Sequence, residues 1–172
     1  GPNTKVRNAY VNVSTGATVQ QTLLPAADAR VAFGYPDVNY GAATALRVRG
    51  GTSPYSSYLS FGLAPLAGKP VVSAKLRLFV TDPSKSGGSV YPVAGGWTES
   101  GITWTNAPAI AGTALASAGS VATGTWVEYD VTGAVWSGSS VFFGVSSSET
   151  DSVYFSSREG TNPPELVVQT LP

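Results

Sequence analysis

The feature that most constrains the fold of this chain is an alternation of apolar and polar residues with a period of two. It occurs in seven short runs between residues 44 and 170. Turn sequences such as GGTSPYS, TDPSKSGG and GTNPP lie between runs, and GYPDVNYG precedes the first run. Such alternation is typical of β-strands that bury one face, and no window of helical period is long enough to predict a helix. The chain is therefore predicted to be all-β.

The apolar residues at alternate positions define the predicted core face of these strands. They are Leu46, Val48, Leu59, Phe61, Leu63, Leu76, Leu78, Val80, Val127, Tyr129, Val131, Val141, Phe143, Val145, Val153, Phe155, Leu166 and Val168. About eight or nine strands in about 150 residues, without alternating helices, predict a β-sandwich of two antiparallel sheets with jelly-roll topology. The alanine-rich stretch 107–118 contains proline and glycine and is predicted to be a loop.

The domain organisation follows from where this patterning begins. We expect residues 22–172 to form one β-sandwich module, since the chain length fits a single domain. Residues 1–21 are polar and weakly patterned, and they are interpreted as a linker or leader strand, with one short strand considered over Tyr10–Val13. Gly1-Pro2 resembles the remnant of a cleaved tag, so the chain is expected to be part of a larger multidomain protein.

Two missing residue types and the charge balance exclude several functional classes. The chain has no cysteine and no histidine, which excludes a disulfide framework, thiolate metal sites and catalysis by imidazole. Only 12% of the residues are charged and the formal net charge is zero, whereas nucleic-acid binders normally carry a basic excess. No stretch has the length of a transmembrane helix. We expect neither nucleic-acid binding nor membrane insertion.

Glu128 and Asp130 form the pair of carboxylates most suited to hydrolysis, because they lie on one face of a predicted strand. No catalytic partner such as histidine accompanies them. Carboxylates on a strand face are ordinarily solvated or paired with arginine, and the chain is therefore not expected to be an enzyme.

A set of basic residues lies on the side of two predicted strands that faces away from the core. The set contains Arg47, Arg49, Lys75 and Arg77. If the two strands are neighbours in one sheet, they form a basic strip that suits an acidic polysaccharide, because guanidinium groups bind carboxylates in a bidentate manner. The alternative is that these charges only protect exposed strands from aggregation.

A loop with the sequence PDVNYG offers oxygen ligands for a cation. Asp37 and Asn39 lie two positions apart in it, and Asp28 and Asp130 are the acids expected to complete such a site. Hard oxygen ligands in a turn suit Ca²⁺, so a structural calcium ion is considered. An Asx-turn, in which the side chain bonds to its own loop, explains the same residues.

Arg158 follows a predicted strand and precedes a loop with the sequence EGTNPPE. An arginine in this context is expected to tie the loop to a carboxylate, with Glu99 and Asp130 as the candidates.

Several blocks of the sequence together resemble the DNRLRE domain, also classed as family 96 of carbohydrate-binding modules. The blocks are ADARV, DVNYGAATALRVRGG, SSYLSFGLAPL, VVSAKLRLFVTD, WTESGITWTNAPA, GTWVEYDVTGAV and VYFSSREGTNPPELVV, and they run from about residue 23 to the end. The resemblance implies a jelly-roll β-sandwich appended to secreted proteins, some members of which bind polysaccharides, including alginate. Where the family usually has RSYLRFDL, this chain has SSYLSFGL and carries less charge.

The four tryptophans are interpreted differently from one another. In WTESGITWTNAPA, Trp104 alternates with Ile102 and is expected to face inward, while Trp97 packs under a long loop. Both are assigned to the framework, because a packed indole buries a large apolar area. Trp126, on the outer face of its strand, and Trp136, in a loop, are the indoles that could contact a ligand.

Two non-catalytic functions are considered for this secreted or cell-surface module, which is expected to be monomeric, and a small polysaccharide lyase using Tyr and Arg or Lys is the least favoured alternative. The first is non-catalytic binding of a polysaccharide, with acidic polymers such as alginate as candidates. Its predicted contacts are the four basic residues Arg47, Arg49, Lys75 and Arg77 and the aromatic residues Tyr55, Tyr58 and Trp126. The second is a structural or adhesive spacer in a large surface protein. A planar row of exposed rings favours the first, and scattered single rings favour the second.

Overall fold

In the computed structural model, which describes residues 17–136 and 138–172, β-strands account for nearly all of the regular structure. The strands are β1 (Val19–Leu23), β2 (Ala27–Ala32), β3 (Ala45–Val48), β4 (Tyr55–Gly62), β5 (Val71–Asp82), β6 (Gly88–Pro92), β7 (Ala116–Ala118), β8 (Trp126–Asp130), β9 (Ser140–Ser146), β10 (Val153–Ser156) and β11 (Glu165–Thr170). In the described ranges the helices are two single 3-10 turns, η1 (Ala64–Leu66) and η2 (Thr132–Ala134), and neither could cross a membrane.

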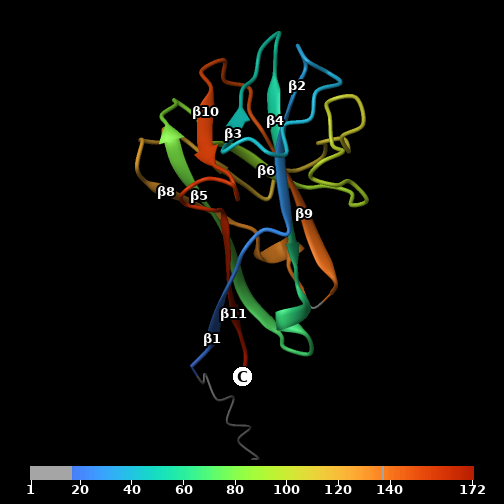
Figure 1. The fold of residues 1–172 in the computed structure, drawn as a ribbon. Helices are drawn as coiled ribbons and strands as arrows, with labels where there is room; N and C mark the ends of the chain where they lie inside the picture. Colours follow the sequence, from blue (N-terminus) through green and yellow to red (C-terminus); the bar gives the residue numbers. More distant parts are fainter. Residues whose placement is uncertain (1–16, 137) are drawn as a thin grey trace, which may run out of the picture.

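The strands form two antiparallel sheets that lie against each other (Figure 1). One sheet has the order β1-β11-β5-β10-β3, and β8 pairs with the edge of β5 opposite to β11. The second sheet has the order β2-β4-β9-β6-β7. The chain passes repeatedly from one sheet to the other, as in a jelly roll. The predicted β-sandwich is confirmed.

The main core lies between the two sheets and contains the apolar residues that the alternation placed there. Leu59 and Phe61 of β4 and Leu76 and Leu78 of β5 are almost completely inaccessible to solvent. Phe61 also packs edge-on against Phe143 of β9, with 6.2 Å between the ring centroids. Burial of this apolar surface is the main force that holds the two sheets together.

Three strands of the second sheet were not among the predicted alternating runs. β2 is covered on both faces, so most of its residues are buried and its sequence does not alternate. β6 and β7 are short, and β7 lies in the alanine-rich stretch 107–118 that was predicted to be a loop. Its three residues pair with Gly88–Val90, and this contact depends on the tertiary fold rather than on local sequence.

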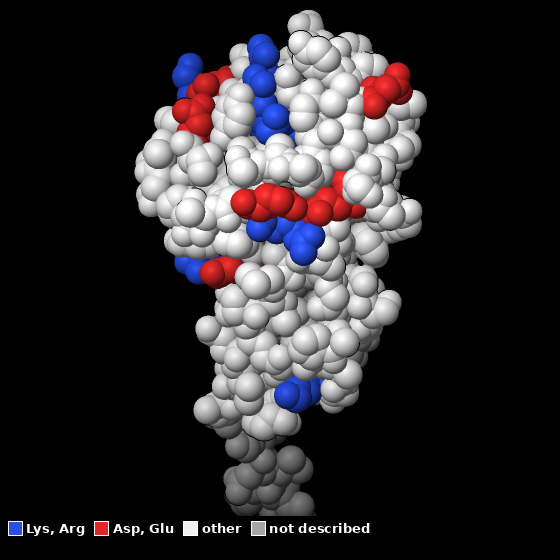
Figure 2. Space-filling model, viewed as in Figure 1, with Lys and Arg blue, Asp and Glu red and all other residues white. Residues whose placement is uncertain are grey.

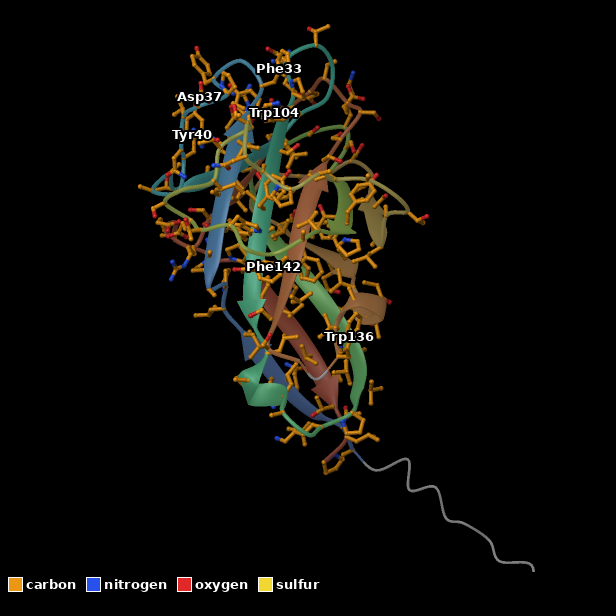
Figure 3. All side chains as sticks on the ribbon, turned by 90° about the vertical axis from the view of Figure 1, so that its right-hand side faces the viewer. Phe33, Asp37, Tyr40, Trp104, Trp136 and Phe142 are labelled. Carbon is orange, nitrogen blue, oxygen red and sulfur yellow. The ribbon has the colours of Figure 1, made fainter. Side chains whose placement is uncertain are left out.

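A long loop, residues 93–115, covers the outer face of the second sheet and is called the covering loop below (Figure 3). It contributes Ile102 to a second apolar cluster that also contains Tyr58 of β4. Gly144 of β9 makes this close packing possible, because a Cβ atom there would approach Val93 and Ile110 of the loop to within 3 Å. The sandwich therefore has a third layer on one side.

β1 lies beside β11 at the end of the molecule where the chain also finishes (Figure 1). It begins at Val19, within the segment 1–21 that the sequence analysis assigned to a linker or leader strand, and Leu23 reaches the main core. The short strand considered over Tyr10–Val13 lies outside the described residues.

Candidate functional site

Arg47 of β3 lies between two tyrosine rings on the outside of the first sheet. Its guanidinium carbon is 3.8 Å from the ring centre of Tyr55 and 5.1 Å from that of Tyr154, and its Nε donates a hydrogen bond to Ser152 Oγ (3.0 Å). Arg49, two positions along, donates from Nε to a backbone carbonyl. Arg47, Arg49, Tyr55 and Tyr154 are called the arginine–tyrosine patch.

Strand pairing brings the members of this patch together. Leu46 and Val48 face the core, so the arginines between and after them point outward. Arg47 pairs in register with Tyr154 of β10, and the backbone of Arg49 exchanges two hydrogen bonds with Tyr55. In the described part of the chain, none of the ion pairs involves either arginine. The patch therefore presents two cationic groups that have no carboxylate partner among the described residues.

Arg77 of β5 also lies over an aromatic ring, but its charge is neutralised. Its guanidinium carbon is 4.6 Å from the ring centre of Trp126, which packs edge-on against Phe79. Its Nε is 3.3 Å from Glu128, and a terminal nitrogen is 2.9 Å from Glu165. The guanidinium of Arg77 is therefore already paired with two carboxylates.

The continuous basic strip expected from the sequence is not formed. It required β3 and β5 to be neighbours, but β10 lies between them. Arg47 and Arg49 are therefore separated from Lys75 and Arg77. On the face shown in Figure 2, Lys and Arg form small separate groups, several of which lie beside acidic residues.

Tyr58 cannot serve as an exposed stacking ring, contrary to the expectation from its alternation. Only 4% of the residue is exposed, because the covering loop packs over it. Its hydroxyl donates a hydrogen bond to the carbonyl of Pro108 (2.7 Å), and burial raises the pKa of Tyr58 to about 12. Tyr58 holds the loop to the sheet.

The structure places Trp97 and Trp104 in the packing of the covering loop, as predicted. Trp97 packs edge-on against Tyr58 and Phe142, with centroid distances of 6.1 and 6.2 Å. Trp104 meets Phe33 edge-on at 5.7 Å, and Phe33 is itself 52% exposed. Figure 3 shows Phe33 and Trp104 close together and Trp136 far from both.

Three carboxylates from distant parts of the chain converge at the edge strand β2. One oxygen each of Asp28, Glu99 and Glu159 lies within 4.8 Å of the other two, and these residues are called the acidic triad. Asp28 is buried, Glu99 is half-buried and Glu159 is exposed. Desolvation by burial raises the pKa of Asp28 to about 7, the backbone N–H of Arg158 lowers it, and the charges of Glu159 and Glu99 raise it further.

Arg158 ties its loop to Glu99, one of the two carboxylates predicted for it. A terminal nitrogen donates to both carboxylate oxygens of Glu99, at 3.2 and 3.1 Å, and the backbone N–H of Arg158 donates to Asp28 Oδ2 (2.9 Å). Glu99 also accepts the backbone N–H of Asp28. Arg158 therefore contacts two members of the triad, Glu99 through its guanidinium and Asp28 through its backbone N–H.

The structure does not bring together the four residues that the sequence analysis proposed for a cation. Asp37 accepts a hydrogen bond from Thr105, and Asp130 caps the turn at Thr132, whose hydroxyl and N–H lower the pKa of Asp130. Asn39 lies beside the triad, but its amide nitrogen donates to the carbonyl of Glu99, and its Oδ1 accepts the N–H of Gly41 as in an Asx-turn. Only Asp28 belongs to the triad.

Sequence reasoning missed Tyr154, Glu99 and Glu159 as members of these two sites. Tyr154 could have been found, because it alternates with Val153 and Phe155 in a predicted strand and must face outward. Glu99 was considered only as a partner of Arg158. Nothing in the local sequence shows that Asp28 and Glu159, which are 131 positions apart, lie together.

Comparison with known families gives one match. The model of carbohydrate-binding module family 96 matches residues 19–170, which is nearly the whole chain. Among curated proteins, none matches.

Proposed function

The chain belongs to carbohydrate-binding module family 96, and from this premise we propose that its arginine–tyrosine patch binds an acidic polysaccharide without cleaving it. Modules of such families are typically non-catalytic, and the histidine-free sequence agrees with that. The observation that carries the proposal is the position of Arg47, which lies against two tyrosine rings and has no carboxylate partner among the described residues.

The chemistry of the patch fits a chain of uronic acids. A guanidinium recognises a carboxylate through two parallel charge-assisted hydrogen bonds, and the exposed edge of a tyrosine can pack against a sugar ring. Contact with Tyr55 and Tyr154 restricts the Arg47 side chain before a ligand arrives. Less conformational entropy is then lost on binding.

Arg77 serves as the comparison for Arg47, because it has a similar aromatic contact and is not expected to bind the polysaccharide. It also lies over an aromatic ring, but Glu128 and Glu165 balance its charge. A sugar carboxylate would have to displace an existing ion pair there. The two arginines therefore form a matched pair for an experiment.

The test is affinity electrophoresis of the full chain in gels that contain alginate, polygalacturonate or neutral hydroxyethylcellulose. We expect retardation by the acidic polymers and none by the neutral polymer. Arg47→Ala should weaken this binding about 10- to 100-fold, the value of a charge-assisted hydrogen bond. Arg77→Ala, which changes the net charge by the same amount, should leave it unchanged.

Two results would overturn the assignment of this site. If the acidic polymers still retard Arg47→Ala, the binding site lies elsewhere on the molecule. If the chain binds the neutral polymer and Phe33→Ala loses this binding, the binding site lies at Phe33 and Trp104 instead.

Absence of binding to every polymer would favour the alternative function, a structural or adhesive spacer without a sugar site. The exposed ring of Trp136 lies far from that of Phe33, and this alternative predicts such scattered exposed rings. Either function implies a secreted or cell-surface protein, and that location remains part of the proposal.

A further inference from the structure

We propose that the acidic triad of Asp28, Glu99 and Glu159 binds one calcium ion. The ion would join three segments that are far apart in the sequence: strand β2, the covering loop and the connection between β10 and β11. This site is independent of the proposed carbohydrate-binding patch, so either proposal can fail without the other.

The spacing of the oxygen atoms suits calcium. Calcium binds carboxylate, carbonyl and water oxygens at about 2.3–2.6 Å, so oxygens on opposite sides of the ion lie about 5 Å apart. The triad provides one oxygen from each of three carboxylates, all within 4.8 Å of one another. Magnesium requires oxygens at about 2.0–2.1 Å in a strict octahedron and keeps several of its waters, so a set of three protein carboxylates suits it less well.

Asp28 supplies an observation that is independent of the clustering of acids. The residue is only 1% exposed, and its Oδ1 atom is buried without a hydrogen-bond donor in the described part of the chain. The other oxygen, Oδ2, accepts the N–H of Arg158. A buried carboxylate oxygen without a partner is unfavourable, and a cation held between the three carboxylates would satisfy it.

The charges around the triad are not balanced by the described residues. Arg158 is the cation in the ion pair with Glu99, and no ion pair of the described residues involves Asp28 or Glu159. With all three carboxyl groups ionised, one guanidinium leaves two negative charges, which equals the charge of one calcium ion.

The site is open to solvent on one side. Glu159 is exposed, and a pocket of about 240 Å³ lies beside the triad, lined by Glu99, Glu159 and Asn39 among others. An ion can enter there, and water molecules can complete its coordination. The hydroxyl of Ser157 lies 2.7 Å from the carbonyl of Ala43 and 3.0 Å from Glu159 Oε2, so its proton is shared between the two acceptors.

The proposal is tested on the full chain at pH 8, after removal of divalent ions with a chelator. Calorimetric titration with CaCl₂ should show one ion bound per chain. The melting temperature should rise by about 5–10 °C at a calcium concentration one hundred times the Kd. MgCl₂ should bind at least tenfold more weakly.

Three variants locate the ion. Asp28→Asn keeps the shape of the side chain and Glu159→Gln changes an exposed residue, and each should lower calcium affinity at least tenfold. Asp37→Asn, an exposed acid outside the triad, is the control and should behave like the parent chain. If Asp28→Asn does not fold, Glu159→Gln decides alone.

Three outcomes would overturn the proposal. They are no calcium binding by the parent chain, a loss of calcium affinity in Asp37→Asn equal to that in the triad variants, or magnesium binding as tight as that of calcium.

Discussion

Arg47 and Arg77 each lie over an aromatic ring, yet their surroundings give them different roles. Arg77 bridges β8 and β11 through Glu128 and Glu165, so its charge is used within the sheet. Among the described residues, the guanidinium of Arg47 contacts a serine hydroxyl and two tyrosine rings and forms no ion pair, so its charge is available to a ligand. Both are arginines on the outward face of a strand, and the neighbouring strands make the difference.

Tyr129 provides a prediction at this scale, because it combines a fully buried ring with one polar contact. Its hydroxyl donates to the carbonyl of Gly87 (2.7 Å), and burial raises the pKa of Tyr129. Tyr129→Phe removes the donor and leaves this carbonyl unsatisfied, which should lower the free energy of unfolding by about 1–3 kcal/mol. Urea denaturation measures the change.

The same substitution at Tyr35, which is largely exposed, serves as the control and should change the free energy of unfolding by less than about 0.5 kcal/mol. Equal effects at the two positions would show that the Tyr129 hydrogen bond does not stabilise the fold.

The covering loop is the element that departs most from a two-layer sandwich. It has no regular secondary structure over residues 93–115, but its side chains pack on the second sheet, and its backbone bonds to the sheet at Val93 and Leu115. Trp97 and Ile102 supply the contacts with Tyr58. The loop is held by side-chain packing rather than by strand pairing, so the removal of one large side chain should release it.

Trp97→Ala is therefore expected to loosen the covering loop and leave the sandwich intact. The lost packing against Tyr58 and Phe142 should lower the free energy of unfolding by about 2–4 kcal/mol. Hydrogen exchange should become faster in residues 93–115 and stay slow in β5. Trp136→Ala, which removes an indole that is 67% exposed, should alter neither measurement.

If exchange accelerates equally in β5 and in the covering loop, the loop is not a separate layer and the whole sandwich depends on Trp97.

At the scale of the whole molecule, the first sheet is completed by the two ends of the described chain. β1 forms one edge and pairs along its full length with β11, which in turn pairs with the long central strand β5. Leu23 of β1 reaches the main core. The described N-terminal segment is therefore part of the sandwich and supplies the hydrogen-bonding partner of β11 along that edge.

Two shortened chains test this role of β1, one starting at Ala17 and the other at Leu24. Loss of β1 removes the apolar contribution of Leu23 and exposes the edge of β11, with an expected cost of about 2–4 kcal/mol. The chain from Leu24 should melt about 5–10 °C below the chain from Ala17. Calorimetric scans of both proteins measure the difference, and equal melting temperatures would show that β1 is dispensable.

The alternation of the sequence predicted the strands whose two faces meet different environments. Leu76 and Arg77 of β5 illustrate this, because one faces the core and the other faces outward as expected. The same reasoning was wrong for Tyr58, whose outward face is covered by the loop, and it missed β2, which is buried on both faces. Periodicity reports a difference between two faces, and it fails where that difference is absent.

The sequence by itself determined the all-β sandwich, the residues of its main core and the outward direction of Arg47, because these depend only on a period of two and on apolar burial. Only the tertiary structure decided that β10 separates the two pairs of basic residues, and that Asp28, Glu99 and Glu159 share one site. Strand order and long-range contacts depend on how the whole core packs. The local sequence around each of these residues carries no record of that packing.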